Sequence, residues 1–178
     1  MLRARKILGV VLAVFVFQAL AADTRQWKTL PAAGLHDPGN PALPSLQNPG
    51  AALRLLPPDT AGNLVNWVKA LRDGYIKPRT NLLETTKVRV LDTDIVMKNT
   101  AEMPYVRFPH LAHTEWLECA NCHEGLFKSK AGATPINMFD ILQGEYCGRC
   151  HGAVAFPLTE CARCHNTSRA AASSQGPK

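Results

Sequence analysis

Hydrophobic residues form one long run near the start of the chain, from Ile7 to Phe17, and only short periodic groups elsewhere. The run is about half of the roughly 20 residues that a membrane-spanning helix needs. Basic residues precede it and small residues follow it, at Arg3, Arg5, Lys6, Ala19 and Ala21. This order is typical of a secretory signal peptide, so residues 1–21 are predicted to be a leader cleaved after Ala21. The alternative, an uncleaved anchor helix, would need a longer apolar stretch, and we expect no stable membrane span.

A helical repeat of apolar residues follows in the middle of the chain, at Leu64, Val65, Trp67, Val68 and Leu71. Asp59-Thr60 precedes the repeat as a candidate cap, and Gly74 follows it as a C-terminal stop. The pattern predicts one amphipathic helix over residues 61–73.

Alternation of apolar and polar residues over 87–98 predicts one strand, or a loose hairpin around Asp92-Thr93. Ahead of the predicted helix, an extended, turn-rich arm is expected over about residues 23–58. It is marked by Pro31, Pro38, Pro41, Pro44, Pro49, Pro57 and Pro58.

The charged residues do not alter these predictions of helix, strand and arm. The 178 residues include 20 Lys or Arg against 14 Asp or Glu, and removal of the leader takes away three of the basic residues. Nucleic-acid binders gather their basic residues on one face or in one run. Here they are scattered, without a block of five like charges, which argues against a nucleic-acid partner.

The six cysteines carry the clearest chemical signal. They fall in three C-x-x-C-H units, which begin at Cys119, Cys147 and Cys161. An exported protein meets oxidising conditions, so its thiols must be paired, metallated or capped. C-x-x-C-H is the attachment motif of c-type haem, in which the histidine becomes a ligand of the iron. Three haem c groups are therefore predicted, attached through Cys119, Cys122, Cys147, Cys150, Cys161 and Cys164 and ligated by His123, His151 and His165.

Two other uses of six cysteines are open to this sequence. Paired C-x-x-C units also bind zinc, and six cysteines could form three disulfides. Neither alternative explains why a histidine follows every second cysteine.

Three haems would also decide the fold class. Residues 106–166 offer about 20 residues for each haem, too few for a conventional core. We expect the porphyrins to form the core of a small multihaem cytochrome c domain, mostly irregular, with short α-helices that carry the motifs. The domain would follow an N-terminal extension, residues 22–105, with the Pro-rich arm and one helix. Residues 167–178 are expected to be a disordered tail.

The three irons need further axial ligands. His110 and His113 follow Pro109, which suits the first turn of a helix, and they are three residues apart, so they would share one face and could reach two neighbouring haems. Candidates for the last position are Met138, since thioether sulfur also binds haem iron, and the distant His36. An open iron is the third alternative. Where Met138 is not the ligand, it would be a gap-filling core residue.

Over about residues 106–166 the sequence resembles the triheme c7-type cytochromes, relatives of the multihaem class III cytochromes of periplasmic and extracellular electron transfer. The resemblance rests on the element Phe108-Pro109-His110-Leu111-Ala112-His113, the long gap before the second motif and the short gap before the third. It implies that His110 pairs with His123, His113 with His151 and Met138 with His165. The usual pattern has histidine where this chain has Met138.

The expected function is a periplasmic or extracellular electron carrier, not an enzyme, that passes single electrons between redox partner proteins. A haem enzyme or sensor would instead leave one iron open to a small molecule. A polymeric conductor, the homo-oligomeric alternative, would use His36 to reach an adjoining subunit. The extension could dock a partner or the haem domain, or could shield the porphyrin edges.

Overall fold

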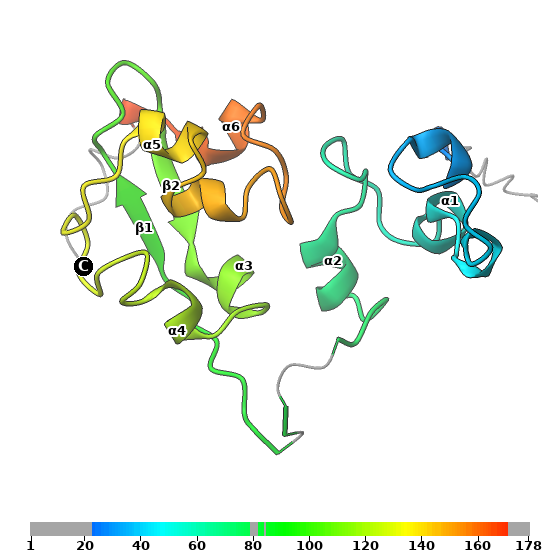
Figure 1. Cartoon of the computed structure of the whole chain (residues 1–178). Coiled ribbons are helices and arrows are strands. Elements are labelled where there is room, and N and C mark those ends of the chain that lie inside the picture. Colours follow the sequence, from blue (N-terminus) through cyan, green and yellow to red (C-terminus); the bar gives the residue numbers. More distant parts are fainter. Residues whose placement is uncertain (1–22, 79–81, 84, 171–178) are drawn as a thin grey trace, which may run out of the picture.

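The computed structural model describes residues 23–78, 82–83 and 85–170. The predicted leader, residues 1–21, and the end of the predicted tail, residues 171–178, lie outside the described residues. Most of the described chain is irregular and carries short helices and one small sheet. An N-terminal segment, residues 23–78, lies beside a C-terminal unit that runs from β1 to β3, residues 94–167 (Figure 1). The prediction of a mostly irregular chain with short helices is confirmed.

The N-terminal segment is folded back on itself and is not the extended arm predicted for residues 23–58. Its short helices η1 (Pro31–Ala33), η2 (Leu43–Ser45) and α1 (Pro49–Leu53) each have a proline in the first two positions, where a missing N–H costs nothing. Arg25 ties the segment together by donating to the carbonyls of Leu64 and Arg54, at 3.0 and 2.8 Å. The Trp27 indole donates to the carbonyl of Asn63 at 2.9 Å.

Helix α2 (Trp67–Arg72) is shorter than the predicted helix 61–73 and starts later. Its cap is Asn66, whose side chain accepts from the Lys69 amide at 2.9 Å, and not Asp59-Thr60. Gly62 and Leu64 adopt left-handed φ angles of 59° and 64°, which no α-helix can contain. The predicted stop at Gly74 is confirmed, with a φ of 77° after the last helical turn.

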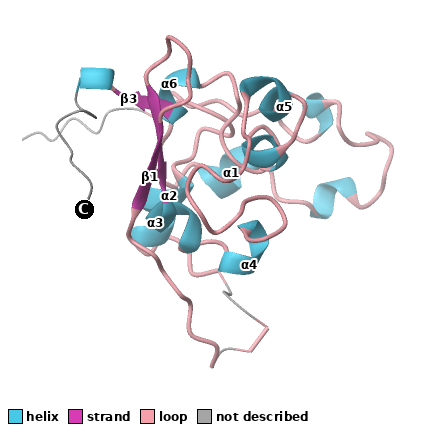
Figure 2. Ribbon diagram, turned by 90° about the vertical axis from the view of Figure 1, so that its left-hand side faces the viewer, coloured by secondary structure: helices cyan, strands magenta, loops and turns pink. Residues whose placement is uncertain are grey.

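The sheet contains strands β1 (Asp94–Met97), β2 (Tyr105–Pro109) and β3 (His165–Thr167) in that spatial order, all antiparallel (Figure 2). β1 lies within the strand predicted over 87–98, whereas the sequence did not predict β2 or β3. β1 pairs Ile95 with Phe108 of β2, so a strand ahead of residue 106 joins the sheet. β3 pairs with the other edge of β2, so the first and last strands flank the same central strand.

The start of the predicted disordered tail is ordered. Thr167 is the last residue of β3. The Arg169 guanidinium lies over the Tyr105 ring, 5.1 Å from its centre, and donates to the carbonyl of Met103 at 3.2 Å.

Short helices carry all three cysteine motifs, as predicted. The first and third motifs form α4 (Cys119–Cys122) and α6 (Cys161–Cys164), and the second begins inside the 3-10 helix η3 (Tyr146–Arg149), which contains Cys147 and has Cys150 as its C-cap. Helix α3 (His110–Thr114) places His110 and His113 in one turn. Pro109 precedes this turn and ends β2, so it does not occupy the first helical turn. Helix α5 (Met138–Leu142) precedes η3 and contacts it.

Buried apolar side chains are few, and in the described residues they all belong to the N-terminal segment: Leu43, Ala61, Val65 and Ala70. In the described C-terminal unit the buried residue is Thr114. Several large apolar side chains of this unit are instead exposed, among them Leu117, Phe139, Leu142 and Val154. No described helix is long and apolar enough to cross a bilayer.

Among the described residues, two ion pairs join the N-terminal segment to the C-terminal unit. Arg72 of α2 binds the Glu115 carboxylate through its Nε, at 2.8 and 3.0 Å from the two oxygens. Arg163 of α6 binds Asp59. These ion pairs therefore hold the stretch from Asp59 to Arg72 against the C-terminal unit.

Candidate functional site

The six cysteine thiols of the three motifs are all free. Within residues 23–170, wherever the structure describes them, no three His, Cys, Asp or Glu side chains lie close enough together to hold a metal ion.

Burial shifts the pKa of three of the six thiols. Burial, with the nearby Cys164, raises the pKa of the Cys147 thiol to about 11. Burial also raises the pKa of the Cys122 and Cys164 thiols. At these three positions the neutral sulfur is favoured over the thiolate.

The second motif is held by a close approach of α5. A Cβ atom at Gly148 would lie 2.0 Å from the carbonyl oxygen of Ile141, a separation that a side chain cannot occupy. The glycine between Cys147 and Cys150 therefore lets the end of α5 rest against the motif backbone.

Five histidines share one hydrogen-bonding arrangement. The Nδ1 atom of each lies 2.8 to 3.1 Å from a backbone carbonyl oxygen. A carbonyl only accepts hydrogen bonds, so Nδ1 carries the proton and Nε2 keeps a free lone pair for a metal. The pairs are His110 with Thr93, His113 with Pro109, His123 with Phe127, His151 with Phe156 and His165 with Pro104.

His113 and His151 lie close together, with their ring planes inclined at 61°. Their ring centres are 6.3 Å apart. Two imidazoles that bind one ion through Nε2, with bonds about 2 Å long, have ring centres roughly 6 Å apart. Phe108 stacks on His113 at 4.2 Å, and Phe156 packs against His151 at 4.4 Å. The residues thus fit one haem iron held between α3 and the second motif, the pairing that the resemblance implies.

Met138 is the first residue of α5, whose cap is Asn137 with its side chain 3.0 Å from the Asp140 amide. The Met138 side chain is 46% exposed, and the neighbouring Phe139 is 69% exposed. Met138 is therefore not a buried gap-filling residue, and its sulfur is accessible.

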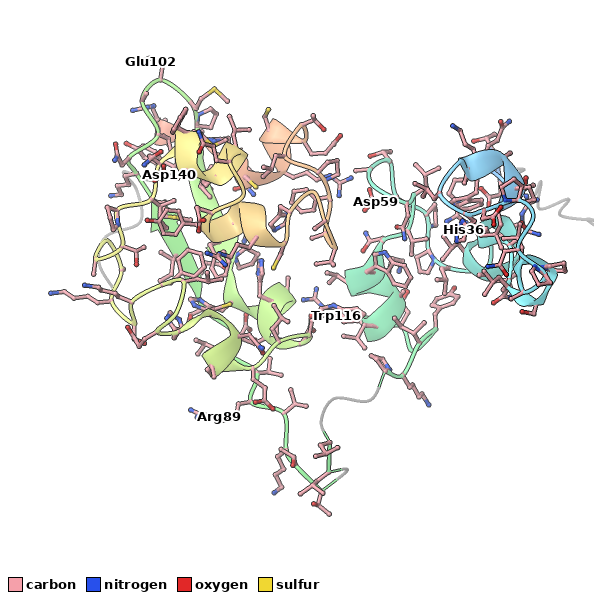
Figure 3. All side chains as sticks on the ribbon, in the orientation of Figure 1. His36, Asp59, Arg89, Glu102, Trp116 and Asp140 are labelled. Atoms are coloured by element: carbon pink, nitrogen blue, oxygen red, sulfur yellow. The ribbon has the colours of Figure 1, made fainter. Side chains whose placement is uncertain are left out.

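His36 lies far from the motifs. It lines a small cavity of about 120 Å³ with residues 37–46 of its own segment. Figure 3 places it at the opposite side of the molecule from Asp140 of α5. In this arrangement His36 does not reach a haem motif of its own chain.

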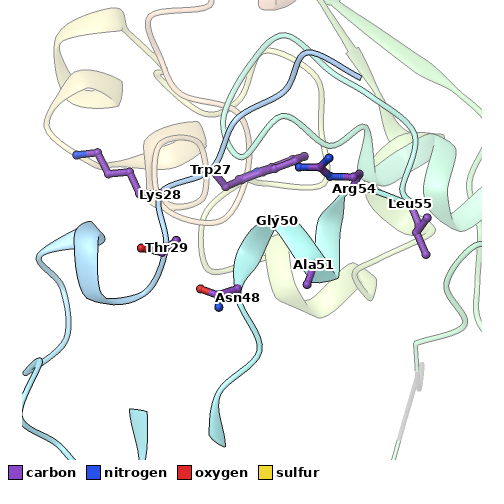
Figure 4. Close-up of a pocket in the computed structure, with 8 residues that line it drawn as sticks. All are labelled: Trp27, Lys28, Thr29, Asn48, Gly50, Ala51, Arg54 and Leu55. Atoms are coloured by element: carbon purple, nitrogen blue, oxygen red, sulfur yellow. The ribbon is translucent and has the colours of Figure 1, made fainter. Parts of the chain in front are cut away.

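A larger cavity, of about 510 Å³, also lies in the N-terminal segment, between Trp27 and α1 (Figure 4). Lys28 and Arg54 contribute charge to its lining. None of the predicted site residues lines it.

Sequence reasoning missed the groups that orient the ligands. The carbonyls of Thr93 and Pro104 belong to residues ahead of the motifs, and a main-chain oxygen leaves no mark in the sequence. The sequence analysis also did not identify Phe156 and Arg163 as neighbours of the site. The position of Arg163 between two motif cysteines is the sequence signal that could have indicated its role.

The C-terminal part of the chain is similar to known multihaem cytochromes. Residues 106–166 match the family described as cytochrome c7 and related cytochrome c. A solved c7-type three-heme cytochrome domain is 32% identical, with 99% of that domain and 45% of this chain covered and a TM-score of 0.39. The chain belongs to the c7-type cytochrome family.

This c7-type cytochrome is also 35% identical to a solved C-terminal hexaheme fragment, over 40% of its own length and 46% of the fragment, with a TM-score of 0.37. No curated protein matches it. The resemblance in the sequence is thereby confirmed, and with it haem c as the cofactor, in a family that carries three haems. The protein is a multihaem c-type cytochrome of electron transfer.

Proposed function

We propose that this c7-type cytochrome carries single electrons between redox partner proteins in the periplasm or outside the cell. The observation that supports the proposal is the pair His113 and His151, whose ring centres are 6.3 Å apart and whose Nδ1 atoms both bond to main-chain carbonyls. Two protein ligands on one iron leave no position for a substrate, as a carrier requires.

Haem c, when bound, supplies an iron that alternates between the ferric and ferrous states. The chain's residues hold and orient it. The cysteines of each motif would attach one haem, and His123, His151 and His165 would each bind the iron from one side. His110, His113 and Met138 would bind the irons from the other side, with His123, His151 and His165 respectively.

The haem faces would also provide the apolar interior of the C-terminal unit. The exposed side chains of Leu117, Phe139, Leu142 and Val154 support this role, because each offers apolar area for a macrocycle to cover. Folding of this unit would then depend on haem attachment.

The full-length holoprotein tests the proposal in two measurements. Mass spectrometry should give the mass of the chain without residues 1–21 plus three covalently attached haems, and fewer haems would mean that a motif is unused. Low-temperature spin resonance of the oxidised protein should give low-spin signals only. A high-spin signal that shifts when cyanide is added would identify an open iron and favour an enzyme or sensor.

A further inference from the structure

Arg163 links the third haem motif to the N-terminal segment. It stands between Cys161 and Cys164, and its guanidinium donates to both carboxylate oxygens of Asp59, with Nη1 3.1 Å from Oδ2. It also donates to the Thr60 hydroxyl at 3.1 Å. The Asp59 and Arg163 side chains are only 14% and 30% exposed, so water screens this pair less than the exposed Lys69–Asp73 pair of the same segment.

The same guanidinium lies on Phe156. Its central carbon is 5.2 Å from the centre of the Phe156 ring, the geometry of a cation–π contact. The N-terminal segment also lies close to Phe156. A Cβ atom at Gly62 would lie 3.9 Å from the Phe156 Cα. Phe156 is therefore held between Arg163 and the turn that follows Asp59.

Phe156 in turn contacts His151 in two ways. Its ring lies 4.4 Å from the imidazole, and its carbonyl oxygen accepts from Nδ1 at 3.1 Å. An acceptor on Nδ1 fixes the orientation of a ligating histidine and strengthens it as a donor to the metal. The contacts thus run without interruption from Asp59 through Arg163 and Phe156 to His151.

From this chain of contacts we infer that Asp59 is a positioning residue for the haem bound by His151 and that it lowers the reduction potential of that haem. Two effects act in the same direction. The carboxylate neutralises Arg163, whose positive charge would otherwise favour the ferrous iron. It also holds Arg163 on Phe156, and so holds the acceptor of His151. The inference rests on the proposed role of His151 as a ligand.

The test is a potentiometric titration of the full-length holoprotein in which each haem is followed by its own spectral signature. Asp59→Asn should shift the midpoint of the His151 haem upward, and the haem of the third motif, which contains Arg163, should shift in the same direction. Asp59→Glu keeps the charge and should restore most of the original value. The control is Asp73→Asn, which removes the same charge from the exposed Lys69–Asp73 pair of the same segment and should leave all three midpoints nearly unchanged.

A double-variant cycle tests the route. Phe156→Leu keeps the carbonyl and the ion pair but removes the ring, so Asp59→Asn should shift the midpoint less in this background. Equal shifts in both backgrounds would overturn the route through Phe156. A shift from Asp59→Asn no larger than that from Asp73→Asn would overturn the inference, and in a protein with three low-spin haems it would leave the proposed function standing. Loss of a haem from the unaltered protein would instead contradict the proposed function.

Discussion

The ring centre of His113, on α3, lies 6.3 Å from that of His151, at the end of the second motif, with the ring planes inclined at 61°. Each ring is fixed by a main-chain acceptor and by a phenylalanine. Neither imidazole can turn away without losing both contacts. The separation is therefore set by the fold and is suited to one shared ion.

Replacement of His113 should affect one haem and spare the others. In His113→Ala one of the irons should lose its second protein ligand and become high-spin, because no other described imidazole has a ring contact with His151. Spin resonance of the oxidised protein measures this. His36→Ala is the control and should leave every signal intact, since His36 lies in a distant cavity. A fully low-spin His113→Ala protein would show that His113 is not a ligand.

Met138 and Met103 provide a matched pair for the remaining axial position. Their side chains are 46% and 45% exposed, so their replacement disturbs packing to a similar extent. Met138→Leu should abolish the weak sulfur-to-iron absorption band in the far red. It should cause no other spectral change of comparable size. Met103→Leu should keep the band. If the band survives in Met138→Leu, the sulfur ligand is another residue or the haem has none.

Gly148 should tolerate no side chain. Gly148→Ala places a methyl group against the Ile141 carbonyl, and α5 would have to move away from the second motif. Overpacking of this kind costs about 1–3 kcal/mol of unfolding free energy, measurable by thermal unfolding of the holoprotein. Gly125→Ala is the control, because a Cβ atom there meets nothing within 4 Å. Equal stability of the two variants would contradict this packing.

Acid should weaken the attachment of the N-terminal segment. The hydrogen bonds from Arg163 lower the pKa of Asp59 below its ordinary value of 3.8. A group with a lowered folded-state pKa stabilises the fold above the ordinary value and loses this contribution as the pH falls through the lowered one. The unfolding free energy of the unaltered protein should therefore exceed that of Asp59→Asn at neutral pH, and the difference should shrink below pH 3.8. A difference that stays constant to the lowest pH would mean that the carboxylate contributes no charge interaction.

The sequence predicted the features of the site that depend on residue type and spacing. The three motifs, their short helices and the pair His110 and His113 in one helical turn follow from spacing alone. The stop at Gly74 was equally readable, since glycine marks a left-handed turn.

Other parts depend on backbone conformation and on distant partners. The left-handed φ angle of Leu64 delays α2, and no apolar repeat reveals it. Strand β3 has three residues, His165–Thr167, too few for an alternating pattern. It exists because β2 lies beside it. Asp59 resembled a helix cap, but its carboxylate binds Arg163, which is 104 residues away.

The main-chain anchoring of the five histidines has an evolutionary consequence. Because each Nδ1 proton goes to a peptide oxygen, mutation of the residue that supplies the oxygen leaves the acceptor in place. Substitutions that arise at Thr93, Pro104 or Phe127 would therefore keep the same imidazole tautomers at His110, His165 and His123.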